Sequence, residues 1–405
     1  MSTSLAWKNL LHNKTRTAVG IAGVGFAVIL IFMQMGFKGA IRKTATQIYD
    51  ALEFDLMLRS PAYLHLTEPR YFPRARLYQA GSLPGVVKAR PFYIGLTEWQ
   101  APMHGKPARE LGPDDPEGQW RGTIVMGTDP KDPGFRRQEL RRAAAILTDP
   151  RFTIVDTKSK PEYGPLRDGR FSEADIGVET ALGKRRVKIV GLFELGTGMA
   201  ANGACMTNPE GFVRACPWQA IDDVNFGLIT LDDKTDPVHA QAMLRGLMGL
   251  GDGDDPHDDV EVLTRAEVNQ REEYRWVVET PLGQIFTLGV WVALFVGVAI
   301  VYQVLSTDIE NMMGEYATLK AIGYSNNYLT AVVLKQSVLL ALVGFIPSLA
   351  VSRLLYYIVE QQSGMPMFMT WQIAVTVLLL SVAMCVISGL AALRKLFAAD
   401  PADLF

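Results

Sequence analysis

The chain has 405 residues, of which 49% are apolar and 20% are charged. Its 40 Lys and Arg residues are balanced by 42 Asp and Glu residues, and the formal net charge of −2 argues against a nucleic-acid-binding protein with a strongly basic face. A chain of this length can form two domains. The distribution of the charged residues along the chain is more informative than their total.

Four long stretches of the chain are almost free of charged residues. A helix rises about 1.5 Å per residue and the hydrocarbon core of a bilayer is about 30 Å thick, so roughly 20 apolar residues are enough to cross it. We therefore predict transmembrane helices at residues 18–37, 283–305, 331–352 and 371–393. The first is too long for the apolar core of a cleavable signal peptide, and no small-x-small cleavage site follows Phe37, so we expect an uncleaved anchor.

The predicted fold is an α-helical membrane protein with one span before a large domain and three spans after it. The domain at residues 38–282 would be a mixed α+β domain, of one or two lobes, that ends in a stalk helix. An even number of spans places both termini on one side, and Arg394 and Lys395 after the last span favour the cytoplasm for that side. The large domain and a short loop at residues 353–370 would then be periplasmic, whereas residues 306–330 and the tail at 394–405 would be cytoplasmic.

Residues 1–17 allow two readings. They form either an amphipathic helix that lies flat on the bilayer, with Trp7 at the level of the headgroups, or a helical extension of the first span.

Within the large domain, alternating or β-branched runs bounded by turn residues predict strands at residues 122–127, 151–156, 186–192 and 226–231. Residues 237–250 are typical of a helix. From Leu263 to Thr280 the sequence predicts a charged helix that continues directly into the second span. The acidic run at residues 251–259 does not have the spacing of an EF-hand, and we expect an exposed turn rather than a calcium site.

Cys205 and Cys216 both lie in the predicted periplasmic domain, where a disulfide is chemically possible. Their spacing in the sequence does not decide whether they pair, because a disulfide requires a short Cα separation.

The sequence lacks the motifs of the common enzyme classes and has no G-x-x-x-x-G-K-[ST] phosphate-binding loop. Residues 177–185 resemble this loop most, but the spacing of their glycines is wrong and no Ser or Thr follows the lysine. The spans hold no ionisable residue apart from Lys335 near one end, which argues against ion-coupled transport. We therefore expect no catalytic residue, no metal site and no bound cofactor in this chain.

Small residues recur every fourth position in two of the spans, a spacing that lets helix backbones approach closely in lipid. We predict that they pack helices together: Gly289, Ala293 and Gly297 in the second span, and Ser381, Cys385 and Gly389 in the fourth.

The segment between the second and third spans predicts a short amphipathic helix. Asp308 is suited to begin it and Gly323 to end it in the left-handed conformation. Its apolar face would offer a surface to a partner protein. The apolar residues of this face are Ile309, Met312, Met313, Tyr316, Leu319 and Ile322.

Several of these stretches resemble FtsX/MacB-type ABC transporter permeases. Residues 315–324 are similar to the family's E-x-x-x-L-(K/R)-A-(I/L/M)-G segment, residues 6–16 to the entry of its first helix, and residues 400–404 to its C-terminal D-P-x-x-x-L tail. Residues 191–203 and 223–229 resemble the DevC branch, although Gly198 and Met199 depart from it and leave the substrate contacts undefined.

The resemblance implies a MacB-like, type VII ABC transporter fold in the bacterial inner membrane and a permease that works as a homodimer in contact with membrane lipid. It implies a separate DevA-like ATPase that binds the ATP and magnesium, a DevB-like membrane-fusion protein and a TolC-like outer-membrane channel. The ATPase-coupling residues would be Glu315, Tyr316, Leu319, Lys320 and Gly323.

The resemblance further implies mechanotransmission, in which ATP hydrolysis on the partner drives export of a lipid, glycolipid or other amphiphile. Two alternatives share the topology: an FtsX-like signalling subunit that activates a cell-wall hydrolase, and a Lol-type permease that releases lipoproteins. The sequence does not identify the substrate.

Overall fold

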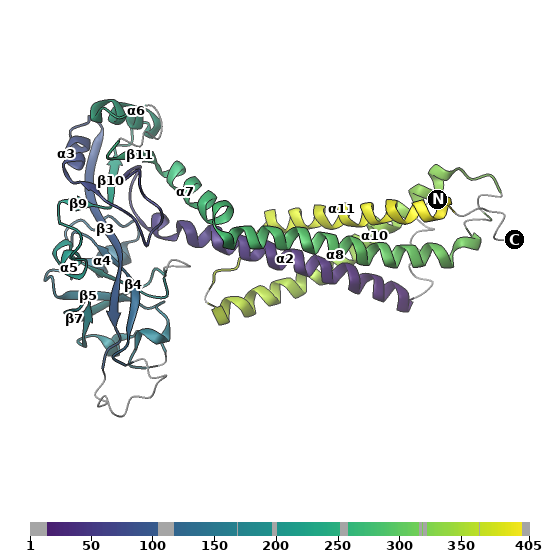
Figure 1. Ribbon diagram of the computed structural model, residues 1–405, viewed down its shortest axis with the longest axis horizontal. Coiled ribbons are helices and arrows are strands. Elements are labelled where there is room, and N and C mark those ends of the chain that lie inside the picture. Colours follow the sequence, from purple (N-terminus) through teal and green to yellow (C-terminus); the bar gives the residue numbers. More distant parts are fainter. Residues whose placement is uncertain are drawn as a thin grey trace. The chain divides into compact units, whose positions relative to one another are not determined.

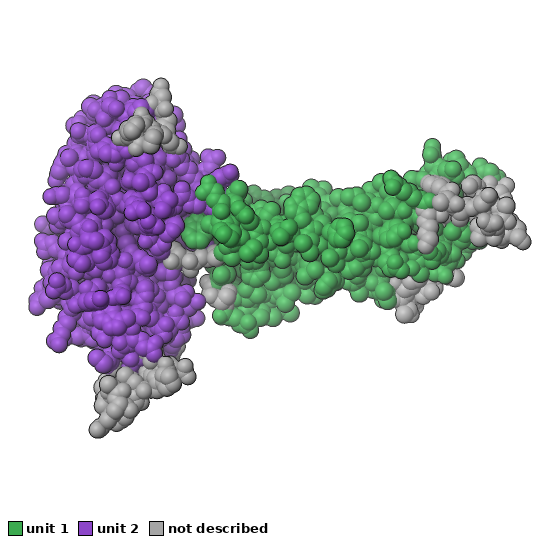
Figure 2. All heavy atoms as spheres, in the orientation of Figure 1, with its two compact units in different colours: residues 1–42, 276–405 green, residues 43–275 purple. Residues whose placement is uncertain are grey.

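The structure is a computed structural model (Figure 1) that describes residues 14–103, 117–167, 169–196, 201–251, 258–315, 318, 322–363 and 365–398. The chain forms two compact units (Figure 2). Unit 1 contains residues 1–42 and 276–405, and unit 2 contains residues 43–275.

Unit 1 is built from helices that are long and apolar enough to cross a membrane. They are α2 (Lys14–Ala51), α8 (Pro281–Asn311), α10 (Asn326–Ser363) and α11 (Trp371–Ala398). Their best windows have mean hydropathies between 2.1 and 2.6. The described part of the chain therefore contains four candidate spans, as the charge-free stretches predicted.

These helices are held together by apolar packing and by hydroxyl groups that bond to the backbone of a neighbouring helix. Helix α11 packs against α8 and α10, and Phe32 of α2 contacts Phe345 of α10 with 5.7 Å between ring centroids. The Ser348 hydroxyl donates to the carbonyl of Gly25, and the Ser388 hydroxyl donates to that of Val298. Small hydroxyl groups thus link helices without placing a charge in the apolar bundle.

The helices extend beyond the predicted spans. Helix α2 continues from the predicted end near residue 37 to Ala51, α8 reaches Asn311, and α10 continues to Ser363, so most of the predicted loop at residues 353–370 is helical. A stretch without charged residues shows which part of a helix can lie in the hydrocarbon core of a bilayer. The helix itself continues until its backbone hydrogen bonds stop.

The predicted continuous stalk is wrong. Helix α7 ends at Tyr274, residues 275–279 form a π-helical turn, and Thr280 adopts an extended conformation (φ −75°, ψ 145°) before α8 begins. The cause lies in Thr280 and Pro281: proline disfavours the helical conformation of the residue before it, and the Thr280 side chain caps α8 by accepting from Gly283 N–H.

Unit 2 is built around a nine-stranded sheet in the order β11-β1-β10-β3-β4-β8-β5-β7-β6. The long strand β3 (Val86–Gln100) belongs to two lobes, because its first half pairs with β10 and its second half with β4. A further pairing of β3 with β6 closes the second lobe into a ring. The other strands are β1 (Leu56–Arg59), β4 (Trp120–Gly127), β5 (Phe152–Asp156), β6 (Glu179–Leu182), β7 (Arg185–Phe193), β8 (Ala204–Thr207), β10 (Phe226–Leu231) and β11 (Glu261–Thr264).

Short elements cover this sheet. A two-stranded sheet joins β2 (Phe72–Pro73) to β9 (Asp223–Val224). The helices are α3 (Ala75–Gly81), α4 (Gln138–Ala144), α5 (Pro209–Ala215), α6 (Pro237–Met248) and α7 (Arg265–Tyr274), with 3-10 turns at Pro161–Tyr163 and Glu173–Asp175.

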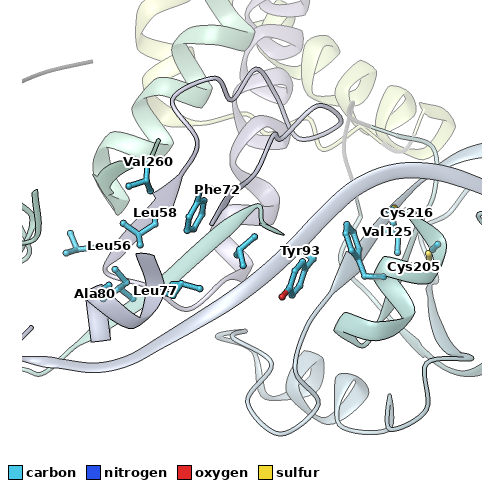
Figure 3. Packing of buried hydrophobic residues seen from close by; sticks show 14 of the residues in the cluster. Leu56, Leu58, Phe72, Leu77, Ala80, Tyr93, Val125, Cys205, Cys216 and Val260 are labelled. Atoms are coloured by element: carbon cyan, nitrogen blue, oxygen red, sulfur yellow. The ribbon is translucent and has the colours of Figure 1, made fainter. Parts of the chain in front are cut away.

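Two apolar cores lie on opposite faces of the strands. Successive strand residues point to opposite faces, so Leu56 and Leu58 enter the first core and Met57 enters the second. Figure 3 shows part of the first core, with Leu58, Phe72 and Val260 at one end and Cys205 and Cys216 at the other.

The two cysteines are buried in the first core as free thiols, so the disulfide that the sequence left open is not formed in this structure. Burial raises the pKa of both thiols, that of Cys216 to about 12. A thiol that stays protonated in an apolar core is a poor nucleophile, and both cysteines act as packing residues.

The Gly-Lys pair that resembles part of a phosphate-binding loop in the sequence forms the turn of the β6–β7 hairpin. Gly183 and Lys184 occupy the two-residue turn with φ angles of +55° and +62°, as a type I′ turn requires. A Cβ on Gly183 would overlap the carbonyl oxygen of Ala215. Gly183 is therefore needed both for its backbone conformation and for its lack of a side chain.

We expect Gly183→Ala to destabilise unit 2 more than Gly177→Ala does. Both glycines have positive φ, which costs an alanine about 1–2 kcal/mol, but Gly177 has open space around it. The clash at Gly183 adds about 1–3 kcal/mol. Thermal unfolding of the purified full-length variants measures the difference, and equal losses of stability would show that the close approach to Ala215 is unimportant.

Candidate functional site

The connector between α8 and α10 contains helical residues at 313–315 and at 318, as predicted, but this helix does not begin at Asp308. Asp308 lies inside α8 instead of starting a new helix, and its carboxylate accepts a hydrogen bond from the Gln336 amide of α10 at 3.2 Å. Helix α8 ends at Asn311, Gly323 has a φ of +104°, and α10 begins at Asn326. The two helices are therefore tied to each other beside the connector.

The first half of the predicted apolar face is used by the helix bundle itself. Ile309 is buried in the bundle core, and Met312 and Met313 pack against that core. Tyr316, Leu319 and Lys320 lie outside the described residues, so their coupling role stays a prediction.

A different set of connector residues is open to solvent. Glu315 is exposed, as are Ile322 (70%) and Tyr324 (45%) on either side of Gly323. The Tyr324 ring packs on Tyr328 of α10 with 4.7 Å between centroids. An exposed isoleucine and an exposed tyrosine are side chains that suit contact with another protein.

The small residues of α8 lie where the helices approach each other. A Cβ on Gly289 would come within 2.5 Å of Gln34 in α2, and one on Gly297 would overlap Met384 of α11 and come within 2.8 Å of Ala27. Ala293 between them is buried. This stripe therefore contacts both α2 and α11.

The predicted residues of α11 show the same pattern. Ser381 and Cys385 are fully buried, and a Cβ on Gly389 would collide with the Ser337 hydroxyl of α10.

A buried charged cluster lies at the start of unit 2, and the sequence analysis did not foresee it. We define the Arg59 cluster as Tyr49 at the end of α2, Arg59 of β1, Tyr63, Glu261 of β11 and Glu272 of α7. Arg59 Nε lies 2.5 Å from Glu261 Oε1, and Arg59 Nη1 lies 3.0 Å from Glu272 Oε1. The Arg59 guanidinium also lies over the Tyr63 ring, whose hydroxyl bonds to that of Tyr49 at 2.5 Å.

The electrostatics of the cluster keep Arg59 charged. Burial alone would lower the pKa of its guanidinium, but the attraction of Glu261 and Glu272 holds that pKa above its ordinary value. One cation is thus shared by two carboxylates from different elements. Removing it would leave Glu272 buried without its ion-pair partner and Glu261 paired only with Arg271, and breaking a buried pair in this way is strongly destabilising.

Arg265, the first residue of α7, closes the C-terminal end of α2. Its guanidinium donates to the carbonyls of Tyr49, Leu52 and Phe54 at 2.7–3.1 Å, and it stacks on the Phe54 ring at 3.9 Å. The last carbonyls of a helix have no partner within the helix. Arg265 adds a second donor to the Tyr49 carbonyl and donates to the carbonyls of Leu52 and Phe54 just beyond the helix, and burial lowers its pKa to about 10.

The same end of α2 also contacts the closed lobe. The Gln47 amide donates to the carbonyl of Leu195, in the segment after β7. Asp156 fixes this segment by accepting from the N–H groups of Leu195 (3.2 Å) and Gly196 (2.5 Å), and burial raises the pKa of its carboxyl. The last turns of α2 therefore reach both lobes of unit 2.

Among the described residues, no group of three His, Cys, Asp or Glu side chains is placed to hold a metal ion.

We expect Arg265→Ala to reduce the stability of unit 2 by about 3 kcal/mol, because it leaves several buried carbonyls without donors. Arg265→Lys should recover only part of this loss, since a single ammonium group cannot reproduce the planar fork of donors. Chemical denaturation of the two variants checks the order, and an alanine variant as stable as the wild type would refute the capping role.

Comparison with known proteins supports a permease. Residues 287–401 match the family of FtsX-like permease C-terminal domains. Among curated proteins, none matches the chain. The matched region contains most of α8 and all of α10 and α11, so the predicted resemblance is confirmed for this part of the chain.

Two solved structures are similar to the chain at low identity. The periplasmic region of MacB from Actinobacillus actinomycetemcomitans is 8% identical, with a TM-score of 0.35, and the alignment covers 56% of this chain and 95% of that one. The extracellular domain of the ABC-type transporter YknZ from Gram-positive bacteria is 12% identical, with a TM-score of 0.31, and the alignment covers 52% of this chain and 99% of that one.

Proposed function

We propose that this chain, whose C-terminal part is an FtsX-like permease domain, is the membrane subunit of an ABC transporter that works by mechanotransmission. A separate cytoplasmic ATPase would bind and hydrolyse ATP, and the movement would pass through the helices of unit 1 to unit 2. The cargo would be a lipid, glycolipid or other amphiphile. The complex would be a permease homodimer in the bacterial inner membrane, within a tripartite system that includes a DevB-like membrane-fusion protein and a TolC-like channel.

The match of residues 287–401 carries this proposal. The sequence itself adds that the chain has no phosphate-binding loop and almost no ionisable residues in its spans, so neither ATP hydrolysis nor ion coupling by this chain is expected to supply the energy. A partner ATPase meets that need.

The continuity of α2 supports transmission between the units. Residues 14–42 of this helix belong to unit 1 and residues 43–51 to unit 2, with no break between them. A continuous helix keeps its backbone hydrogen bonds along its length and resists bending, so a displacement of one end reaches the other. The link through residues 275–280 lacks this continuity.

The exposed connector residues are the proposed contact with the ATPase. Glu315, Ile322 and Tyr324 are open to solvent next to the junction of α8 and α10. A partner that pushes on this surface would act on both helices, because the hydrogen bond between Asp308 and Gln336 ties them.

We expect Glu315→Ala combined with Tyr316→Ala to reduce stimulation of the partner ATPase by about tenfold or more, which corresponds to about 1.4 kcal/mol of lost interaction. The measurement is ATPase activity with the permease in lipid nanodiscs. Glu360→Ala, near the other end of α10, is the matched control and should leave stimulation unchanged. Full stimulation of both variants would contradict the proposed coupling.

The orientation has its own test. Every native cysteine is buried, so an introduced thiol can be labelled against a low background. A membrane-impermeant maleimide added to intact spheroplasts should label Lys234→Cys in unit 2 and should not label Ser325→Cys in the connector, both exposed positions. The opposite pattern would reverse the proposed topology.

A further inference from the structure

Glu272 carries a buried carboxylate that is only half paired. Its side chain in α7 is 1% exposed, and Oε1 lies 3.0 Å from Arg59 Nη1. The second oxygen, Oε2, is buried and has no hydrogen-bond partner among the described residues. Buried polar atoms almost always find partners, so an orphaned carboxylate oxygen calls for a functional explanation.

The arginines around Glu272 form more ion pairs with Glu261, the other carboxylate of the Arg59 cluster. Glu261 of β11 is bound by two arginines, Arg59 at 2.5 Å and Arg271 at 2.7 Å. Glu272 shares Arg59 and is attracted by Arg275, whose guanidinium lies 5.7 Å from the centroid of the Tyr63 ring and donates to the Tyr63 carbonyl. Tyr63 and, through it, Tyr49 of α2 complete the surroundings.

This arrangement costs stability at neutral pH. Burial raises the pKa of Glu272 above its ordinary value of 4.5 and outweighs the attraction of Arg59 and Arg275. Since the folded-state pKa lies above the unfolded one, the ionised carboxylate is destabilising at neutral pH. The cost disappears as the pH falls through the folded-state pKa towards 4.5.

The chain directly after Glu272 leaves regular α-helical geometry. Residues 275–279 form a π-helical turn, which is rare and concentrates at functional sites. Trp276 in this turn has a buried indole N–H without a partner among the described residues. Thr280 is then extended, so α7 is not continued rigidly into α8.

We propose that Glu272 makes α7 an element with two positions: in the position seen here Arg59 pairs with Oε1 and Oε2 has no hydrogen-bond partner among the described residues, and a rearrangement of residues 275–280 gives Oε2 a partner. Glu272 is then a positioning residue whose under-paired charge lowers the barrier to moving α7. The link between this movement and ATPase coupling rests on the proposed function, whereas the movement itself does not.

The first test measures stability and local opening. Glu272→Gln removes the charge at constant shape, and Arg59 keeps Glu261 as its counterion. We expect the full-length variant to unfold at the same or a higher temperature than the wild type at pH 7.5. The wild type should gain stability relative to the variant as the pH is lowered towards 5.

Hydrogen exchange reports on α7 directly. In Glu272→Gln, the amides of residues 266–274 should exchange severalfold more slowly than in the wild type at pH 7.5. Without the charge, the position of α7 seen here is favoured over the second position, so the helix opens less often. Glu210→Gln at an exposed position of α5 is the control and should change neither the exchange of these amides nor the pH dependence. A Glu272→Gln variant that is less stable, or that exchanges faster, would overturn the inference.

The second test measures coupling with the same variants. Glu272→Gln should reduce stimulation of the partner ATPase severalfold although the protein is no less stable, and Glu272→Asp, which keeps the charge, should restore much of it. Loss of stability and of stimulation together would indicate a merely structural residue and refute the proposal.

The two proposals fail in different ways. If the connector variant at Glu315 and Tyr316 lowers stimulation while Glu272→Gln leaves it intact, the inference about α7 is wrong and the permease function stands. If neither variant changes stimulation, the coupling function itself is wrong, and the hydrogen-exchange result alone decides whether α7 has two positions.

Discussion

The capping of α2 by Arg265 is the interaction on which the rest of unit 2 depends. One guanidinium joins the segment that enters the unit, at Tyr49 and Leu52, to the segment that leaves it, at the start of α7. The Arg59 cluster then fastens the same two segments to β1 and β11. The sheet therefore receives both segments at fixed points, and its two cores can stay rigid while the segments bear load.

The two links between the units differ in stiffness. Helix α2 is unbroken, whereas the return path is interrupted by a π-helical turn and an extended threonine. In the proposed permease, α2 would transmit a movement and the second connection would yield to it. The sequence alone suggests instead that the second connection is the rigid one, a continuous helix from Leu263 into the second span.

Part of the fold follows from local sequence, and part does not. The apolar spans and the strands β4, β5, β7 and β10 were predictable because each satisfies a local pattern. Strand β3 was not predictable, because Pro91 and Gly95 argue against a strand. The alternation of apolar and polar residues along β3 is also lost where its pairing changes from β10 to β4. The Thr-Pro pair indicates the break at Thr280, whereas the charged helical pattern before it favours a continuous helix.

The Arg59 cluster was beyond prediction for a different reason. Arg59 lies more than 200 positions from Glu261 and Glu272 in the sequence, and only the closing of β1 between β10 and β11 brings them together. The connector shows the converse: of its predicted apolar face, Ile309 is buried in the helix bundle and Met312 packs partly against it. A periodic pattern shows that a face is apolar, and the tertiary fold decides what buries it.

The closure of β3 onto β6 determines how other proteins can recognise unit 2. Among the described residues, each strand of the ring pairs with a neighbour on both sides along part of its length, so the ring offers only short stretches of edge to which a foreign strand could be added. The edge at the other end of the sheet, β11, is only four residues long and begins with the ion-paired Glu261. A molecule that docks on this sheet is therefore expected to contact mainly its side chains and loops, and the same closure limits backbone pairing between copies of the unit.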